Sequence, residues 1–160
     1  MIRPLLVSIT FFVAPLVTGD MLAAQSAADS AAIRAVALDY AEGWYTADSA
    51  RMTRALHPRL AKRIVMTPRD GGNARLGDMT AEQLVHGTAQ GGGSRTPADR
   101  RQADVQILDI FQNTASVRLT MADWIDYMHV AKWDGRWVVI NVLWEMKPRQ
   151  GQAGTSARSD

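Results

Sequence analysis

The sequence predicts one α+β domain in which helices come first and an antiparallel sheet follows. The chain has 160 residues, which is enough for one hydrophobic core and too short for two ordinary domains. Apolar residues between Ile33 and Trp44 recur at helical spacing. The last third instead contains four runs of β-forming residues, with turn residues after the first and the third. These two patterns, in this order, predict the α+β class.

Composition excludes several kinds of chemistry. The 18 Lys and Arg and the 16 Asp and Glu residues are scattered along the chain, so nucleic acid is not an expected partner. The chain has no cysteine, which excludes disulfides, thiol nucleophiles and thiolate metal sites. No two histidines have the spacing of metal ligands. We therefore expect neither a metal ion nor another cofactor.

The N-terminus has the features of a secretory signal peptide. Arg3 precedes an uncharged apolar run at 5–17 that is too short to span a bilayer comfortably. Small residues follow that allow cleavage after Ala24 or Ser26, and we expect cleavage after Ala24. The expected location is periplasmic or secreted, with no stable membrane anchor after cleavage. The predicted organisation is a signal peptide at 1–24, a folded domain at 27–148 and a disordered tail at 149–160.

Two helices open the predicted domain. The first carries the apolar stripe that ends at Trp44, and Asp29 or Ser30 can cap its N-terminus. Asp48 is placed to cap a second helix at 49–56. Pro58 prevents that helix from continuing.

Two short strands and a third helix come next. Residues 60–67 and 74–79 are rich enough in β-forming residues to predict strands. Thr80 and Gln83 have the spacing of a capping box, which predicts the start of a helix. The glycines at 91–93 end it.

The last third predicts a four-stranded antiparallel meander. Its strands are expected at 101–112, 115–124, 125–133 and 136–146. The second and third of these have no clear turn between them, so a bulge or an offset is expected near Asp123 to Asp126. Asp134-Gly135 suits a type I′ hairpin. That turn pairs Trp133 with Arg136, Val130 with Val139, and Met128 with Asn141.

This register divides the last hairpin into two faces. One carries Asp126, Met128, Trp137, Val139, Asn141 and Glu145, and the other carries Tyr127, His129, Trp133, Ile140 and Trp144. Both faces are largely apolar, so we expect both to be covered, one by the helices and one by a second subunit. The sequence thus predicts a homodimer with Trp144 packed across its interface.

Three segments of the chain resemble one known family. They are EGWYTAD at 42–48, ALHPRLAKR at 55–63 and DYMHVAKWDGRWVVINVLW at 126–144. They are similar to the "putative lumazine-binding" branch of the nuclear-transport-factor-2-like (SnoaL-like) superfamily, over essentially the whole expected domain. The resemblance implies a cone-shaped α+β fold in which a curved antiparallel sheet wraps around the first helix and leaves a pocket. Superfamily members include isomerases, dehydratases and cyclases, so the fold alone does not select a function.

The resemblance also implies a set of pocket residues. It puts the pocket between the first helix and the concave face of the sheet. The implied ligand-binding residues are Tyr40, Trp44, His57, Met66, Asp126, Met128, Asn141 and Glu145. The expected ligand is a small apolar or heterocyclic molecule, and no residue is assigned a catalytic role.

Three functions agree with these residues. The leading hypothesis is an exported small-molecule-binding protein without established catalysis. The second is an acid–base isomerase or dehydratase for a small apolar carbonyl compound, in which Tyr40 acts with Asp126 or Glu145. The third is a dimeric protein-interaction module. The same side chains also agree with structural roles: Tyr40 and Trp44 as core aromatics, Asn141 on a backbone group, Asp126 beside an arginine, and His57 as a cap or against Trp44.

Overall fold

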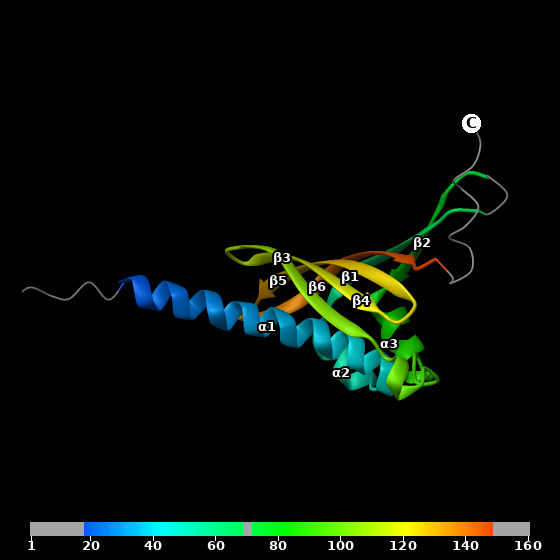
Figure 1. The fold of residues 1–160 in the computed structure, drawn as a ribbon, viewed down its shortest axis with the longest axis horizontal. Coiled ribbons are helices and arrows are strands. Elements are labelled where there is room, and N and C mark those ends of the chain that lie inside the picture. Colours follow the sequence, from blue (N-terminus) through cyan, green and yellow to red (C-terminus); the bar gives the residue numbers. More distant parts are fainter. Residues whose placement is uncertain (1–17, 69–71, 149–160) are drawn as a thin grey trace, which may run out of the picture.

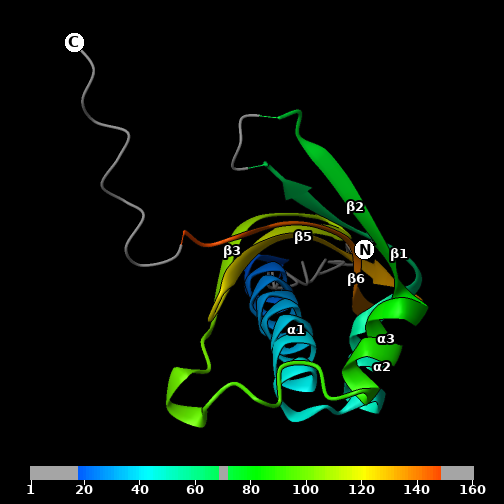
Figure 2. The same ribbon diagram turned by 90° about the vertical axis from the view of Figure 1, so that its right-hand side faces the viewer.

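The computed structural model describes residues 18–68 and 72–148. Its elements form two layers, a curved sheet and a set of helices on the concave side of that sheet (Figure 1). Viewed end-on, the sheet arches over the long first helix, with the two shorter helices beside it (Figure 2). The predicted α+β class is confirmed.

The helices arise from local signals that the sequence displays. Their bounds are α1 Thr18–Thr46, α2 Ser49–Ala55, α3 Ala81–Ala89 and the 3-10 turn η1 Ala98–Arg100. Asp48 caps α2 by accepting a 2.8 Å hydrogen bond from the backbone N–H of Arg51. The capping box of Thr80 and Gln83 opens α3 as predicted. In contrast, α1 begins at Thr18, so Asp29 lies inside it and does not cap it.

The strands form one six-stranded mixed sheet with the order β2-β1-β6-β5-β4-β3. Their bounds are β1 Leu56–Met66, β2 Arg75–Thr80, β3 Ala103–Phe111, β4 Thr114–Met121, β5 Trp124–Trp133 and β6 Arg136–Met146. Strand β1 pairs with β6 in parallel, and every other neighbouring pair in this sheet is antiparallel. The parallel pairing joins the first strand of the domain to its last.

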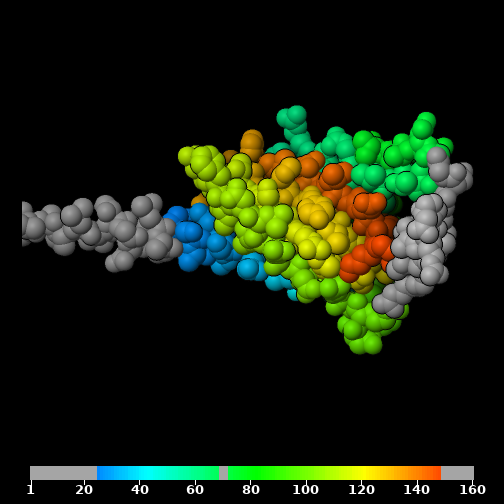
Figure 3. Space-filling view, turned by 45° about the horizontal axis from the view of Figure 1, so that its top comes forward, coloured from blue at the N-terminus to red at the C-terminus, as the bar shows by residue number. Residues whose placement is uncertain are grey.

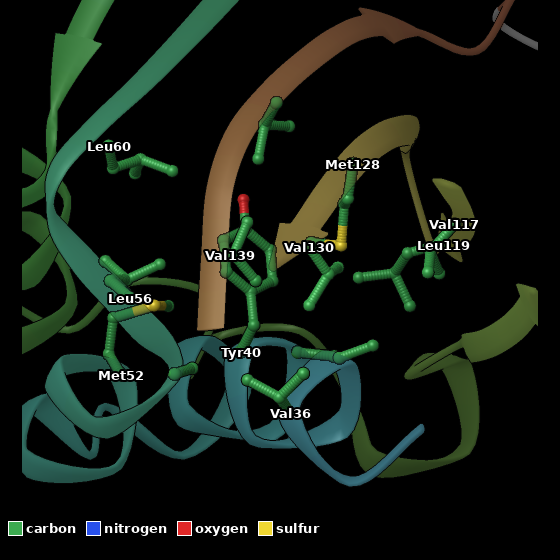
Figure 4. Packing of buried hydrophobic residues seen from close by; sticks show 14 of the residues in the cluster. Val36, Tyr40, Met52, Leu56, Leu60, Val117, Leu119, Met128, Val130 and Val139 are labelled. Atoms are coloured by element: carbon green, nitrogen blue, oxygen red, sulfur yellow. The ribbon is translucent and has the colours of Figure 1, made fainter. Parts of the chain in front are cut away.

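The core lies between α1 and the concave face of the sheet. Val36 and Tyr40 face it from the helix, and Met128, Val130 and Val139 face them from the sheet (Figure 4). The helical stripe and the strand alternation that the sequence predicts therefore meet in one apolar layer.

The last hairpin follows the predicted register only near its turn. Asp134 and Gly135 have φ angles of 48° and 78°, as a type I′ turn requires. Pairing then runs as predicted from Trp133↔Arg136 to Val130↔Val139. Beyond that pair the register shifts, so that His129 lies opposite Asn141 and Ile140 is the extra residue of a β-bulge.

Beyond Ile140, this bulge reverses which side chains of β6 face the core and which face outward. Met128 pairs with Val142 rather than Asn141, and Asp126 pairs with Trp144. Because side chains alternate along a strand, one extra residue turns Trp144 inward and Glu145 outward. The predictions that Asn141 and Glu145 face the pocket and that Trp144 faces a second subunit are therefore wrong.

The prediction of a bulge or an offset near Asp123 to Asp126 is also wrong. Strands β4 and β5 pair in one continuous register from Thr114↔Ala131 to Thr120↔Ile125. The chain reverses through Ala122 and Asp123.

The predicted signal peptide and tail fall largely on residues 1–17 and 149–160, which lie outside the described residues. None of the helices in the described part of the chain is both long and apolar enough to cross a membrane.

Candidate functional site

A cavity of about 180 Å³ opens at the end of the sheet where α1 and α3 approach β1 and β6. Its walls are mainly aromatic and aliphatic. The lining residues are Tyr40, Trp44, Lys62, Met79, Leu84, Asp123, Trp124, Trp144 and Met146. A larger and more open hollow of about 960 Å³ lies beside α2 and α3, but its ionisable side chains, Glu82 and His86, are exposed. The smaller cavity is the better candidate because buried charges converge on it.

Three tryptophans form an edge-to-face series along one side of this cavity. The ring centroids of Trp44 and Trp124 are 6.1 Å apart, with the planes at 84°. Those of Trp124 and Trp144 are 5.8 Å apart at 64°. Edge-to-face indole contacts hold the three rings against one another and present a rigid apolar wall.

Tyr40, Lys62 and Asp126 form a buried polar cluster at the cavity. The Lys62 Nζ donates hydrogen bonds to Asp126 Oδ1 at 2.6 Å and to the Tyr40 hydroxyl at 2.7 Å. The second carboxylate oxygen of Asp126 accepts a 2.9 Å hydrogen bond from Trp124 Nε1. Lys62 is 5% exposed and Asp126 is fully buried. A charged pair this deep is held by its hydrogen bonds rather than by water.

The surroundings of the cluster shift the protonation equilibria of its members. Burial lowers the pKa of the Lys62 ammonium below its usual range, and the Asp126 carboxylate opposes part of that shift. Burial and the same carboxylate raise the pKa of the Tyr40 hydroxyl well above its usual value. The indole of Trp144, centred 4.6 Å from the Lys62 Nζ, stabilises the cation.

Strand pairing explains why these side chains meet. Lys62 lies on β1 opposite Met79 on one side and Val142 on the other, both of which face inward. Asp126 lies on β5 opposite Trp144. Tyr40 comes from the buried stripe of α1, and its ring extends from the helix toward the sheet (Figure 4). Three elements therefore supply one polar group each.

Gly92 and Gly93 pack closely against Trp44. The backbone N–H of Gly93 donates to the Trp44 carbonyl at 2.9 Å. A Cβ on Gly93 would lie 2.5 Å from the Trp44 ring, and one on Gly92 would lie 2.7 Å from the Trp44 carbonyl oxygen. Only glycine allows the loop to cover the indole this closely. The glycine run predicted as a helix end thus also supports a cavity wall.

The structure brings three of the eight predicted ligand-binding residues together. Tyr40 and Trp44 line the cavity, and Asp126 contacts it through Lys62. Their role in binding stays a prediction.

The other five predicted residues lie elsewhere. Met128 belongs to the core, and Met66 is 43% exposed near the end of β1. His57 packs against Trp133 rather than Trp44, with ring centroids 5.0 Å apart. Because of the bulge, Asn141 lies beside His129 on the outer face, and Glu145 is exposed there.

Lys62 is the central residue that the sequence analysis missed. It stands between Leu60 and Ile64 in the alternation of β1, which makes it a lysine at an inward-facing position. That pattern was visible in the sequence. Its partner Asp126, which lies on β5 and 64 positions away, could not be identified from that pattern.

Comparison with known proteins agrees with this architecture. Residues 28–145 match the family described as "Putative lumazine-binding". The chain belongs to this family. A search of curated proteins gives no match.

Solved structures with the same fold have low sequence identity to this chain. A protein of unknown function from Silicibacter pomeroyi, described as NTF-2 like, has a TM-score of 0.60 at 12% identity, covering 76% of this chain and 98% of its own. An NTF2-like protein of unknown function from Shewanella baltica has a TM-score of 0.58 at 22% identity, covering 76% and 96%. A ketosteroid isomerase-like protein from Erwinia carotovora atroseptica has a TM-score of 0.50 at 14% identity, covering 74% and 96%. These likenesses show the nuclear-transport-factor-2-like fold.

Proposed function

We propose that this protein binds a small, largely apolar or heterocyclic molecule that carries one polar atom. The observation that carries the proposal is the cavity itself, in which tryptophan walls surround a single buried polar cluster. An apolar cavity of about 150 Å³ is enough for benzene. A cavity of about 180 Å³ therefore suits a single-ring ligand.

Family membership supports ligand binding in general, since the family description refers to a small heterocycle. The cavity adds an expectation about orientation. The ligand ring would lie against Trp44 and Trp144, and its polar atom would lie toward Lys62 and Tyr40.

Binding is testable by filling the cavity. Met79 lines it from the edge strand β2, so Met79→Trp should occupy ligand space, whereas Met66→Trp adds the same bulk at an exposed position of β1. We expect benzyl alcohol to change the tryptophan fluorescence, and indole or benzyl alcohol to raise the melting temperature, of the wild type and of Met66→Trp but not of Met79→Trp. A response that survives in Met79→Trp would mean that the ligand binds elsewhere.

An acid–base isomerase or dehydratase is the second candidate. One observation favours it: Asp126 is buried and is linked to Tyr40 through Lys62. Such an enzyme would process a small apolar carbonyl compound, as the likeness to a ketosteroid isomerase-like protein suggests. Turnover that is unchanged in Asp126→Asn would exclude this function.

We further propose that the protein is exported to the periplasm or secreted. The signal-like segment at the N-terminus supports this location. Expression of the full chain in a bacterial host should yield a protein in the periplasmic fraction whose N-terminus is Gln25. A protein that stays in the cytoplasm with an intact N-terminus would contradict it.

A homodimer formed through the outer face of the sheet is the last part of the proposal. This face, formed by β3 to β6, is seen in Figure 3. Tyr127 is 51% exposed on it and Leu143 is 44% exposed. Arg118 lies on the same face, and its buried Nε has no hydrogen-bond partner among the described residues. A second copy would cover the apolar side chains and supply an acceptor.

The dimer is tested by light scattering at micromolar concentration. Leu143→Asp should give a monomer, and Leu76→Asp, at an exposed position of the edge strand β2, should not. A dimer combined with an empty ligand screen would favour the interaction-module hypothesis. A monomeric wild type would contradict the dimer.

A further inference from the structure

Lys62 differs from the other two lysines of the chain, Lys132 and Lys147, in what surrounds it. Lys132 pairs with Asp29 at a partly exposed position. Lys147 donates to the side chain of Gln102 and to two backbone carbonyls. Of the three, Lys62 is the one that lines the cavity walled by Trp44, Trp124 and Trp144. It is therefore the lysine that an apolar molecule would meet on entering the protein.

The groups around Lys62 are those that an amine needs in order to attack a carbonyl carbon. An acceptor for its proton, Asp126 Oδ1, is 2.6 Å from Nζ. A hydroxyl that can donate to an incoming oxygen, that of Tyr40, is 2.7 Å from the same nitrogen. Burial also favours the neutral, nucleophilic amine of Lys62 by lowering its pKa. The apolar walls would exclude the water that competes for such an adduct.

We propose that Lys62 is a nucleophile that captures a small apolar aldehyde or ketone as a covalent imine. The proposal rests on the function proposed above, since it uses the same cavity. It narrows the ligand class from apolar molecules with a polar atom to molecules whose polar atom is a carbonyl oxygen.

The reaction balances with the groups present. The Lys62 ammonium transfers one proton to Asp126, and the freed nitrogen lone pair forms a bond to the carbonyl carbon. The C=O π bond breaks and its electron pair moves to the oxygen, to which the hydroxyl of Tyr40 donates a hydrogen bond. A proton moves from nitrogen to oxygen, which gives a neutral carbinolamine. The C–O bond then breaks, and the hydroxyl leaves as water with the proton from Asp126. The product is a cationic iminium beside the ionised Asp126, and its charge replaces that of the ammonium.

The experiment uses the three lysines as internal controls. The full-length wild type is incubated with benzaldehyde and sodium cyanoborohydride, which reduces an iminium to a stable secondary amine, and the modified peptides are identified by mass spectrometry. We expect modification at Lys62 to exceed that at Lys132 and Lys147, although both of those are more accessible. Benzyl alcohol should reduce labelling at Lys62 only. Labelling that follows exposure, with Lys62 the least modified, would overturn the proposal.

A variant removes the nucleophile without leaving a buried charge. Lys62→Met combined with Asp126→Asn should lose the cavity adduct, and Lys132→Arg should keep it. If benzyl alcohol still changes the fluorescence of the wild type but benzaldehyde gives no Lys62 adduct, the covalent step is wrong and ligand binding stands. If neither compound binds, both proposals fail. Should the double variant not fold, the distribution of label among the three wild-type lysines still decides.

Discussion

Two regions of the interface between α1 and the sheet carry the same three residue types in different surroundings. At the cavity, Lys62 and Trp124 donate to Asp126 at 2.6 and 2.9 Å. Farther toward the N-terminus of α1, Lys132 and Trp137 both donate to Asp29 at 2.9 Å. We refer to these as the inner cluster and the outer cluster.

Burial separates the two clusters. The lysine and aspartate side chains of the inner cluster are 5% and 0% exposed, against 27% and 15% in the outer cluster. Water can solvate the outer pair, which forms a partly exposed salt bridge between α1 and the β5–β6 hairpin. The inner pair has no such solvation, and each member depends on the other. Equal residue types and similar distances therefore do not imply equal chemistry.

Removal of each lysine should show the largest difference. Lys62→Met leaves the Asp126 carboxylate buried without a counter-charge, which should lower the free energy of unfolding by about 3–5 kcal/mol. Lys132→Met should cost much less, because water reaches Asp29. Urea unfolding followed by circular dichroism measures both. Adding Asp126→Asn to Lys62→Met should recover part of the loss, and equal losses for the two lysines would contradict the distinction.

The loop that packs on Trp44, a wall of the cavity beside the inner cluster, can be tested at Gly93. In Gly93→Ala the new methyl group would collide with the Trp44 ring, so we expect a loss of about 1–3 kcal/mol and weaker ligand binding. Gly87→Ala is the matched control, because its Cβ would lie 4.0 Å from the same ring. That change, within α3, should stabilise the protein by about 0.5–1 kcal/mol. Chemical unfolding and fluorescence titration would measure these effects, and similar results for the two variants would argue against the close-packed wall.

The outer cluster should have the smallest effect and a characteristic pH dependence. Three hydrogen bonds, from Gln25, Trp137 and Lys132, lower the pKa of Asp29 from 3.8 to about 2. A lowered carboxylate pKa stabilises the folded state above the unfolded value, so this stabilisation is complete above pH 3.8 and is lost as the pH falls to about 2.

The check is a series of unfolding curves across that range. The wild type should be more stable than Asp29→Asn at pH 6, and the difference should shrink between pH 3.8 and about 2. A difference that is constant over this window would show that the ionised form of Asp29 is not what ties the helix to the hairpin.

The cavity and the inner cluster beside it also show where prediction from the sequence succeeded and where it failed. Tyr40, Trp44 and Asp126 were identified in the sequence, and all three lie at or beside the cavity. Lys62, which joins Tyr40 to Asp126, was not identified. A strand lysine between apolar neighbours signals an unusual position, but the sequence does not say which carboxylate it meets.

In the hairpin of β5 and β6, the sequence likewise predicted local features but not the pairing farther from the turn. The Asp134-Gly135 turn and the first four residue pairs followed from the sequence, because they depend on the backbone angles of two residues. The bulge at Ile140 did not, and it reversed the orientation of Trp144.

By itself, the sequence determined the short helices α2 and α3 with their caps, the type I′ turn and the α+β class, since the local elements depend on residues within a few positions of one another. The tertiary structure decided the parallel pairing of β1 with β6, the bulge in β6 and the contact between Lys62 and Asp126. These features depend on how a curved sheet closes around α1. Groups far apart in the chain come close enough to pair their charges and hydrogen bonds only once the sheet has formed.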